Sequence, residues 1–317
     1  MARLNPTVSE FRALYSAIES SQALTLGSPP ANEPTLVARL AVHLTNQLNV
    51  IHLSRGHVLQ SSAVFVHGRP QVTASTFPKP KPGSVEIGDL LLLRTHVHRG
   101  IVTERRAILF QAKLIDSIPA KPDNPNQHFL YSDGPWFKYV RSGRELNGQM
   151  RRVAGRRDYK GLQYLLIVKS KLPSPASCST ITPGVKPAIF VAEPTQPILS
   201  AYRCGTSELL DFVTGIAGRE FLSPTTERSY GWDRVVDDLI RYGAQKSVIA
   251  RRAGFPGGRR ATWLLSGTPH PNGITAAQLS ESLAKSPPDF VNSAGDELTA
   301  FSIVEVVVGT TDDQGPN

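Results

Sequence analysis

The chain has 317 residues, of which 40% are hydrophobic, and this content suffices to bury a substantial core in one elaborated domain or two packed ones. Lysine and arginine total 35 against 26 aspartate and glutamate residues, so the formal net charge is +9 and the surface should attract polyanions. No apolar run approaches the roughly 20 residues needed to span a bilayer, so we expect a cytoplasmic protein that does not enter a membrane.

Two helices are predicted at the start of the chain. The segment Thr7-Val8-Ser9-Glu10 matches a capping box, and the helix that follows is expected to pack outside the main core. A second helix is predicted from Glu33, and its signals are the N-cap Asn32, Pro34 in the first turn and an apolar stripe of Leu36, Leu40, Leu44 and Leu48. This pattern places the Glu33 carboxylate at the N-terminal end of the core-facing stripe.

A hairpin is predicted between residues 89 and 113. Asp89 precedes the apolar run of 90–93, Gly100 lies in a polar turn, and residues 107–110 are apolar on both faces, as in a central strand. Because strand side chains alternate, Gln111 and Lys113 project together to one face where the core ends, and Ala112 faces the other way. The hairpin can bring Asp89 beside Gln111.

Asp89, the hairpin and Gln111-Ala112-Lys113 together resemble the PD-(D/E)XK nuclease superfamily, in the Q-x-K variant found in Mrr-type restriction endonucleases and prokaryotic phage-defence nucleases. The resemblance covers roughly the first half of the chain. It implies an α/β fold with a restriction-endonuclease-like αβββαβ core, a mixed central sheet and additional helices. Gly88 stands where this family usually has proline, and Gln111 replaces the commoner acidic residue.

The residue types at these positions suit hydrolysis with a hard cation. Oxygen ligands for Mg²⁺, or for Mn²⁺, are available from Asp89, from the Gln111 amide and from the Ala112 carbonyl, and Lys113 can orient water or neutralise developing charge. Because Gln111 is neutral, a further carboxylate is expected, with Glu33 preferred and Glu86 as the alternative. The competing interpretations are a strand that simply reaches solvent at Lys113 and a Glu33 that only favours the helix dipole.

The later segments predict a second group of elements. We expect a helix over 128–140, a buried strand over 161–170 and a partner strand over 186–193. Tyr131, Trp136, Phe137 and Tyr139 are expected in the core, and stacking on nucleic-acid bases is the alternative interpretation. A division is placed near Thr195, between a nuclease core of residues 1–195, including the N-terminal helix, and a mostly helical accessory region of residues 196–317. That region contains predicted helices over 206–218 and 231–252 and strands over 261–267 and 302–310. Cys178 and Cys204 are expected to be reduced.

Basic residues gather in two segments that are candidates for phosphate contacts with DNA: Arg151, Arg152, Arg156 and Arg157, and then Arg251, Arg252, Arg259 and Arg260. Solvated basic loops are the alternative interpretation. We therefore expect a Mg²⁺-dependent DNA endonuclease, and its role in bacterial restriction or anti-phage defence rests on the resemblance alone. A defence-system partner protein, an activating signal and homo-oligomer formation stay open. So do two other functions, a ribonuclease using the same site and a catalytically silent nucleic-acid-binding or recruiting subunit.

Overall fold

The computed structural model describes residues 3–27, 32–54, 56–67, 70–99, 101–153, 159–168, 189–194, 198–222, 231–246 and 300–310. The predicted strand over 261–267 lies outside these residues.

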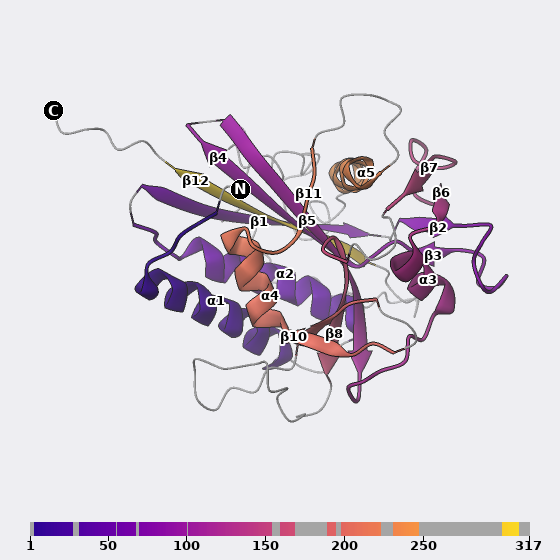
Figure 1. Cartoon of the computed structure of the whole chain (residues 1–317), viewed down its shortest axis with the longest axis horizontal. Helices are drawn as coiled ribbons and strands as arrows, with labels where there is room; N and C mark the ends of the chain where they lie inside the picture. The colour runs from indigo at the N-terminus through magenta and orange to yellow at the C-terminus, as the bar shows by residue number, and fades with distance from the viewer. Residues whose placement is uncertain are drawn as a thin grey trace.

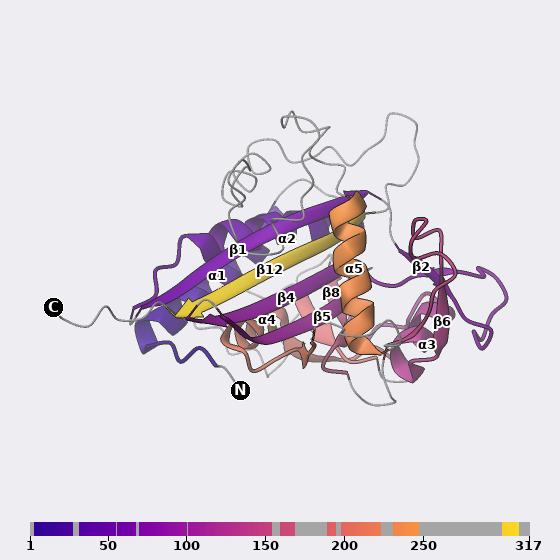
Figure 2. The ribbon, with the colours of Figure 1, turned by 90° about the horizontal axis from the view of Figure 1, so that it is seen from above.

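The main sheet is mixed and runs in the order β1-β12-β4-β5-β8-β9-β10, with β11 paired to β5. Figure 2 shows β1, β12, β4 and β5 side by side. Its strands are β1 (His57–His67), β4 (Leu90–His98), β5 (Ile101–Ile115), β8 (Leu162–Val168), β9 (Ile189–Ala192), β10 (Ala201–Cys204), β11 (Arg219–Glu220) and β12 (Ala300–Thr310). The pairs β12–β4 and β5–β8 are parallel, and the other pairs are antiparallel. The predicted α/β class with a mixed central sheet is confirmed.

Helices and a small second sheet cover the two faces of the main sheet (Figures 1 and 2). On one face lie α1 (Val8–Gly27), α2 (Glu33–Asn49) and α4 (Gly205–Thr214), and on the other lie α3 (Pro125–Asp133) and α5 (Trp232–Lys246). The small sheet has the order β3-β2-β6-β7, with β2 (Gln71–Thr73), β3 (Val85–Glu86), β6 (Trp136–Val140) and β7 (Met150–Arg152).

Coverage of both faces explains the continuous apolar run of β4. Leu90 and Leu92 pack toward α1, α2 and α4, whereas Leu91 and Leu93 pack toward α3 and α5, and all four side chains are buried. The predicted strands at 161–170 and 186–193 appear as β8 and β9, which pair antiparallel.

The predicted helix starts are confirmed at α1 and α2. At α1 the Thr7 amide donates to the Glu10 carboxylate and the Glu10 amide donates to Thr7 Oγ1, which completes the capping box. At α2 the Asn32 side chain accepts from the Thr35 amide at 3.1 Å, and the leucine stripe is buried.

The helix predicted over 128–140 is wrong in its second half. α3 ends at Asp133 because Gly134 adopts a left-handed conformation at φ 55°, and residues 136–140 form β6. In β6 the exposed Trp136 and Lys138 alternate with the buried Phe137 and Tyr139, as expected for a strand with one covered face. Tyr131, Phe137 and Tyr139 are in the core as predicted, but Trp136 is 46% exposed.

The C-terminal strand β12 lies inside the main sheet, antiparallel to β1 and parallel to β4. Segments from both sides of the expected division near Thr195, itself outside the described residues, therefore build one sheet together. The predicted helices beyond it appear as α4 and α5.

Cys204 is disulfide-bonded, so the expected reduced thiol is wrong at this position, and Cys178 lies outside the described residues. Within the described ranges, no helix is long and apolar enough to cross a membrane. The cytoplasmic location stays a prediction.

Candidate active site

The candidate site forms where β5 continues beyond the end of its partner β4. The hairpin pairs Leu90 with Phe110, and the Asp89 amide donates to the Phe110 carbonyl at 2.8 Å. From residue 111 onward, no strand among the described residues lies beside β5 on the β4 side, although β5 stays paired with β8 on the other. The backbone groups of Ala112 and Leu114 that point to the β4 side therefore need other partners.

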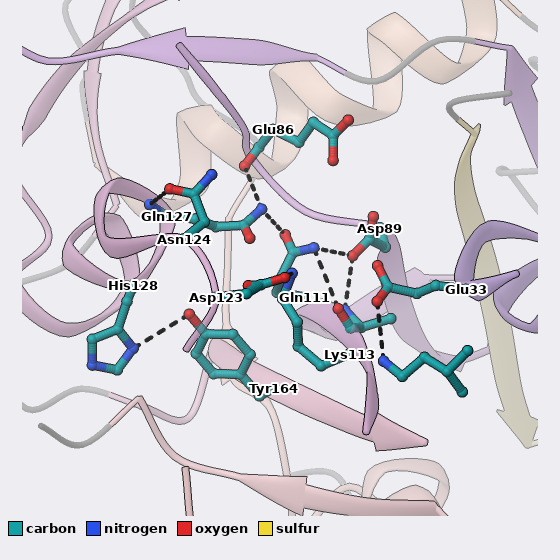
Figure 3. A network of polar contacts seen from close by, with 12 residues as sticks. Glu33, Glu86, Asp89, Gln111, Lys113, Asp123, Asn124, Gln127, His128 and Tyr164 are labelled. Atoms are coloured by element: carbon teal, nitrogen blue, oxygen red, sulfur yellow. Dashed lines mark hydrogen bonds and ion pairs between the residues drawn. The ribbon is translucent and has the colours of Figure 1, made fainter. Parts of the chain in front are cut away.

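Two carboxylates supply these partners. The Ala112 amide donates to Asp89 Oδ2 at 2.8 Å, and the Leu114 amide donates to Glu33 Oε2 at 3.1 Å (Figure 3). Alternate amides on an extended strand are about 7 Å apart, so the two acidic groups lie along the same short stretch of β5. Glu33, the preferred further carboxylate, therefore lies beside this strand, and this position depends on the N-terminus of α2 lying against β5.

Asp89 and Gln111 are in direct contact, as predicted. Gln111 Nε2 donates to Asp89 Oδ2, and both side chains are only 1% exposed. The Gln111 oxygen faces away from Asp89 and accepts from Gln127 Nε2 at 2.5 Å, and Gln127 Nε2 also lies 3.3 Å from the Glu86 carbonyl (Figure 3). Glu86, the alternative carboxylate, thus contributes its backbone oxygen to this network, whereas it is the Glu33 side chain that bonds to β5.

Lys113 lies beside the acidic groups with its charge retained. Its ammonium is 3.0 and 3.2 Å from the two Asp123 oxygens. Burial alone would lower the pKa of Lys113, but the nearby charges of Glu33, Asp123 and Asp89 outweigh it, and the pKa is raised. Lys113 therefore acts as a cation at neutral pH and does not accept a proton. Asp123, whose side chain is 68% exposed, is a neighbour that the sequence interpretation did not include.

The backbone before Asp89 explains why this chain has glycine there. A Cβ atom on Gly88 would lie 2.6 Å from Leu109 Cδ1 and 3.0 Å from the Tyr131 hydroxyl oxygen. Tyr131 also donates to the Ile87 carbonyl at 2.9 Å. Tight packing against β5 and α3 therefore leaves no room for a side chain, proline included, immediately before Asp89.

Aromatic side chains form the floor of the site beside Gln111. Tyr164 on β8 pairs with Gln111 in the parallel register and packs against Tyr131 with ring centroids 5.4 Å apart. Its hydroxyl lies 3.4 Å from His128 Nδ1. Burial, with the nearby charge of Asp89, raises the pKa of both Tyr131 and Tyr164, so both phenols stay protonated. This floor is neutral and lowers the solvation of the charged groups above it.

Arg151 and Arg152 have different environments, although both were predicted to contact DNA. Arg151 is 4% exposed and its Nε lies 2.6 Å from Asp238 Oδ2 of α5, so it joins β7 to α5 and is not available at the surface. Arg152 is exposed, lies opposite Trp136 across the β6–β7 pair and donates to the Gly134 carbonyl at 3.1 Å. Arg156, Arg157, Arg251, Arg252, Arg259 and Arg260 lie outside the described residues.

The oxygen atoms at the end of β5 fit a hard divalent cation by their chemistry. Asp89 and Glu33 contribute carboxylates at the open edge of β5, and the Ala112 carbonyl faces the same edge as its amide. In the described part of the chain, no group of three or more His, Cys, Asp and Glu side chains could hold a metal ion. A cation here would therefore depend on amide or backbone oxygens together with these two carboxylates.

Comparisons with protein-family models, with curated proteins and with solved structures gave no match to this chain. The site is therefore interpreted from its own geometry and chemistry.

Proposed function

We propose that this protein is a metal-dependent DNA endonuclease of the Q-x-K type. The observation that carries the proposal is the pair of carboxylates, Asp89 and Glu33, bonded to alternate amides of β5 beside the charged Lys113. With the small sheet of β2, β3, β6 and β7 set aside, the order α2, β1, β4, β5, α3 and β8 supports a restriction-endonuclease-like αβββαβ core, to which β12 is an addition within the sheet.

The cation would be Mg²⁺, or Mn²⁺, held by Asp89, Glu33, the Ala112 carbonyl and the Gln111 amide oxygen. When bound, it supplies a polarised water molecule and positive charge at the phosphate. Asp89 is held rigidly for this role, because its amide bonds to Phe110 and its carboxylate bonds to Ala112. Glu33 is fixed in the same way by Leu114.

Lys113 contributes electrostatic stabilisation in this scheme. Because its pKa is raised, the ammonium persists throughout the neutral range, where it can orient the attacking water and neutralise charge that develops on the phosphate. Removing that charge should affect catalysis far more than folding, since Asp123, its ion-pair partner, is largely exposed and can be solvated.

Polyanion binding is supported by the formal net charge of +9 and by the exposed face of β6 and β7. Arg152 and Lys138 lie on that face together with Trp136, which combines phosphate-binding charge with an aromatic surface. Restriction or anti-phage defence is proposed from the sequence resemblance.

A catalytically silent nucleic-acid-binding subunit is the second candidate, and one observation favours it. Gln111 presents its NH₂ group to Asp89, where a ligand to a cation would present oxygen. In this arrangement Asp89 Oδ2 already accepts hydrogen bonds from two protein donors, Gln111 and the Ala112 amide.

The test is hydrolysis of plasmid DNA by the wild-type protein and Lys113→Ala with Mg²⁺, Mn²⁺ or EDTA, after circular dichroism has shown equal folding. Lys121→Ala is the matched control, because Lys121 is an exposed lysine on the loop that leads to α3. We expect metal-dependent cleavage by the wild type and the control and its loss in Lys113→Ala. Full cleavage by folded Lys113→Ala would refute the assignment.

Parallel reactions with RNA and single-stranded DNA separate a ribonuclease from a deoxyribonuclease that uses the same residues. Salt-sensitive binding without hydrolysis of any substrate would identify the silent subunit.

A further inference from the structure

Two buried amides connect Asp89 to the backbone of β3. Gln111 donates to the Asp89 carboxylate, Gln127 donates to the Gln111 oxygen at 2.5 Å, and Gln127 also donates to the Glu86 carbonyl at 3.3 Å. Figure 3 shows this chain of contacts running from α3 across β5 to Asp89. The groups at the two ends of this series of contacts, the Asp89 carboxylate and the Glu86 carbonyl, both accept hydrogen bonds.

The acceptor at each end fixes the direction of every bond between them. The Glu86 carbonyl can only accept, so Gln127 turns its NH₂ group toward it and toward Gln111. Gln111 must then present its oxygen to Gln127, which leaves its own NH₂ group for Asp89. Because Gln111 and Gln127 are only 1% and 4% exposed, solvent water cannot readily replace a hydrogen bond that either amide loses.

A cation beside Asp89 requires the opposite orientation of Gln111. An NH₂ group carries partial positive charge, so Gln111 has to turn its amide by half a turn before its oxygen can face a cation. Its NH₂ group then faces the NH₂ group of Gln127. Two donors in contact are unfavourable, so Gln127 must turn as well and lose its bond to the Glu86 carbonyl.

We propose that Gln127 is a positioning residue that holds Gln111 in its donor-facing orientation, so that divalent cations bind only when both amides turn together. This inference rests on the proposed cation site at Asp89 and deepens it. Gln111, held by Gln127, donates a hydrogen bond to the buried carboxylate while no cation is bound, and this arrangement lowers the affinity of the site for the cation. Cation entry is thereby coupled to the contact between α3 and β3.

The direction in which a substitution of Gln127 changes Mn²⁺ affinity distinguishes this positioning role from simple structural support. Gln127→Met has a similar length but has no donor for Gln111, so turning Gln111 toward a cation no longer breaks a hydrogen bond to residue 127. We expect Mn²⁺ to bind the variant about two- to tenfold more tightly, the range that corresponds to one net hydrogen bond. If Gln127 only supported the site, the same substitution would loosen Gln111 and weaken binding.

Mn²⁺ binding is measured by electron paramagnetic resonance of the free ion, with the full-length wild type, Gln127→Met and Asp89→Asn. Tyr131→Phe is the control, because it removes a different α3 donor, to the Ile87 carbonyl, and leaves the amide chain intact. Thermal unfolding checks that each variant is folded. We expect tighter binding in Gln127→Met, none in Asp89→Asn, and no tightening in Tyr131→Phe.

A second readout follows the amides directly. In ¹⁵N-glutamine-labelled wild type, Mg²⁺ should shift the side-chain NH₂ resonances of both Gln111 and Gln127, which are assigned from single substitutions. Resonance shifts confined to Gln111 would refute the inference that the two amides turn together.

The outcomes separate this inference from the proposed function. If Mn²⁺ binds the wild type through Asp89 but Gln127→Met binds equally or more weakly, the inference is overturned and the cation site stands. If neither the wild type nor Gln127→Met binds Mn²⁺, both fail. Binding by Gln127→Met alone would support the inference most strongly.

Discussion

Glu305 gives the sharpest test of the electrostatics of the main sheet. It lies on β12, is 1% exposed, and accepts from Thr95 Oγ1 of β4 at 2.7 Å. Burial raises the pKa of Glu305 from 4.5 to about 7, although the bond from Thr95 and the charge of Arg105 act in the opposite direction. We predict that Glu305→Gln stabilises the protein at alkaline pH.

The magnitude follows from the pKa. Between pH 4.5 and about 7 the folded protein holds a proton on Glu305 that the unfolded chain has released, so stability falls as the pH rises through this range. At 1.36 kcal/mol per pKa unit, the full difference between the charged and neutral forms is about 3 kcal/mol. Glutamine is neutral at every pH and avoids this loss.

Urea unfolding followed by circular dichroism at pH 5 and pH 8 measures the effect. The difference in free energy of unfolding between Glu305→Gln and wild type should be about 2–3 kcal/mol larger, in the direction of a more stable variant, at pH 8 than at pH 5. Glu145→Gln, at an exposed position, is the control and should show no such difference. An equal effect of Glu305→Gln at both pH values would refute the reasoning, because it would mean that Glu305 is charged in the folded protein throughout.

Four further predictions concern the site and the elements packed around it. Gly88→Ala should lower the free energy of unfolding by about 1–3 kcal/mol, because its Cβ would overlap Leu109; an unchanged urea midpoint would contradict this. Arg151→Met should lower stability by about 3 kcal/mol by leaving Asp238 buried without its principal partner. In contrast, Arg152→Ala should preserve stability and reduce the salt dependence of DNA binding by about one counterion, and unaltered binding would exclude Arg152 from the interface. Burial lowers the pKa of His128 despite Asp133, so only the unfolded chain takes up this proton as the pH falls below 6.5. Stability should therefore decline below pH 6.5 less steeply in His128→Gln than in wild type, and parallel curves would contradict a buried neutral His128.

The local part of the site was accessible from the sequence. The contact of Asp89 with Gln111 follows from a hairpin whose strands are adjacent in the chain, and strand alternation gives the faces of Gln111 and Lys113. For Glu33, the N-cap and the leucine stripe indicated the phase of α2. The hydrogen bond from the Leu114 amide to Glu33 also requires β5 to extend beyond the end of β4. No local sequence pattern specifies this difference in strand length.

The tertiary part of the site was not accessible in the same way. Gln127 lies in the first turn of α3, and its role depends on how that helix packs over β5 and β3. Polar residues in a first turn usually face solvent, so residue type alone does not indicate a buried amide. By contrast, Gly134-Pro135 and the alternation in 136–140 did indicate the end of α3 and the strand β6, and the helical interpretation gave them too little weight.

The position of β12 sets the order in which this protein can be completed on the ribosome. Its partners in β1 and β4 are made more than about two hundred residues earlier, and they are not adjacent to each other in the sheet. Until residues 300–310 have emerged, β1 lacks its neighbour and the outer edge of β4, the strand that follows Asp89, is open. A nascent chain therefore contains all the proposed catalytic residues long before it contains the sheet that supports them. Synthesis of the candidate site is therefore separated in time from completion of the sheet around it.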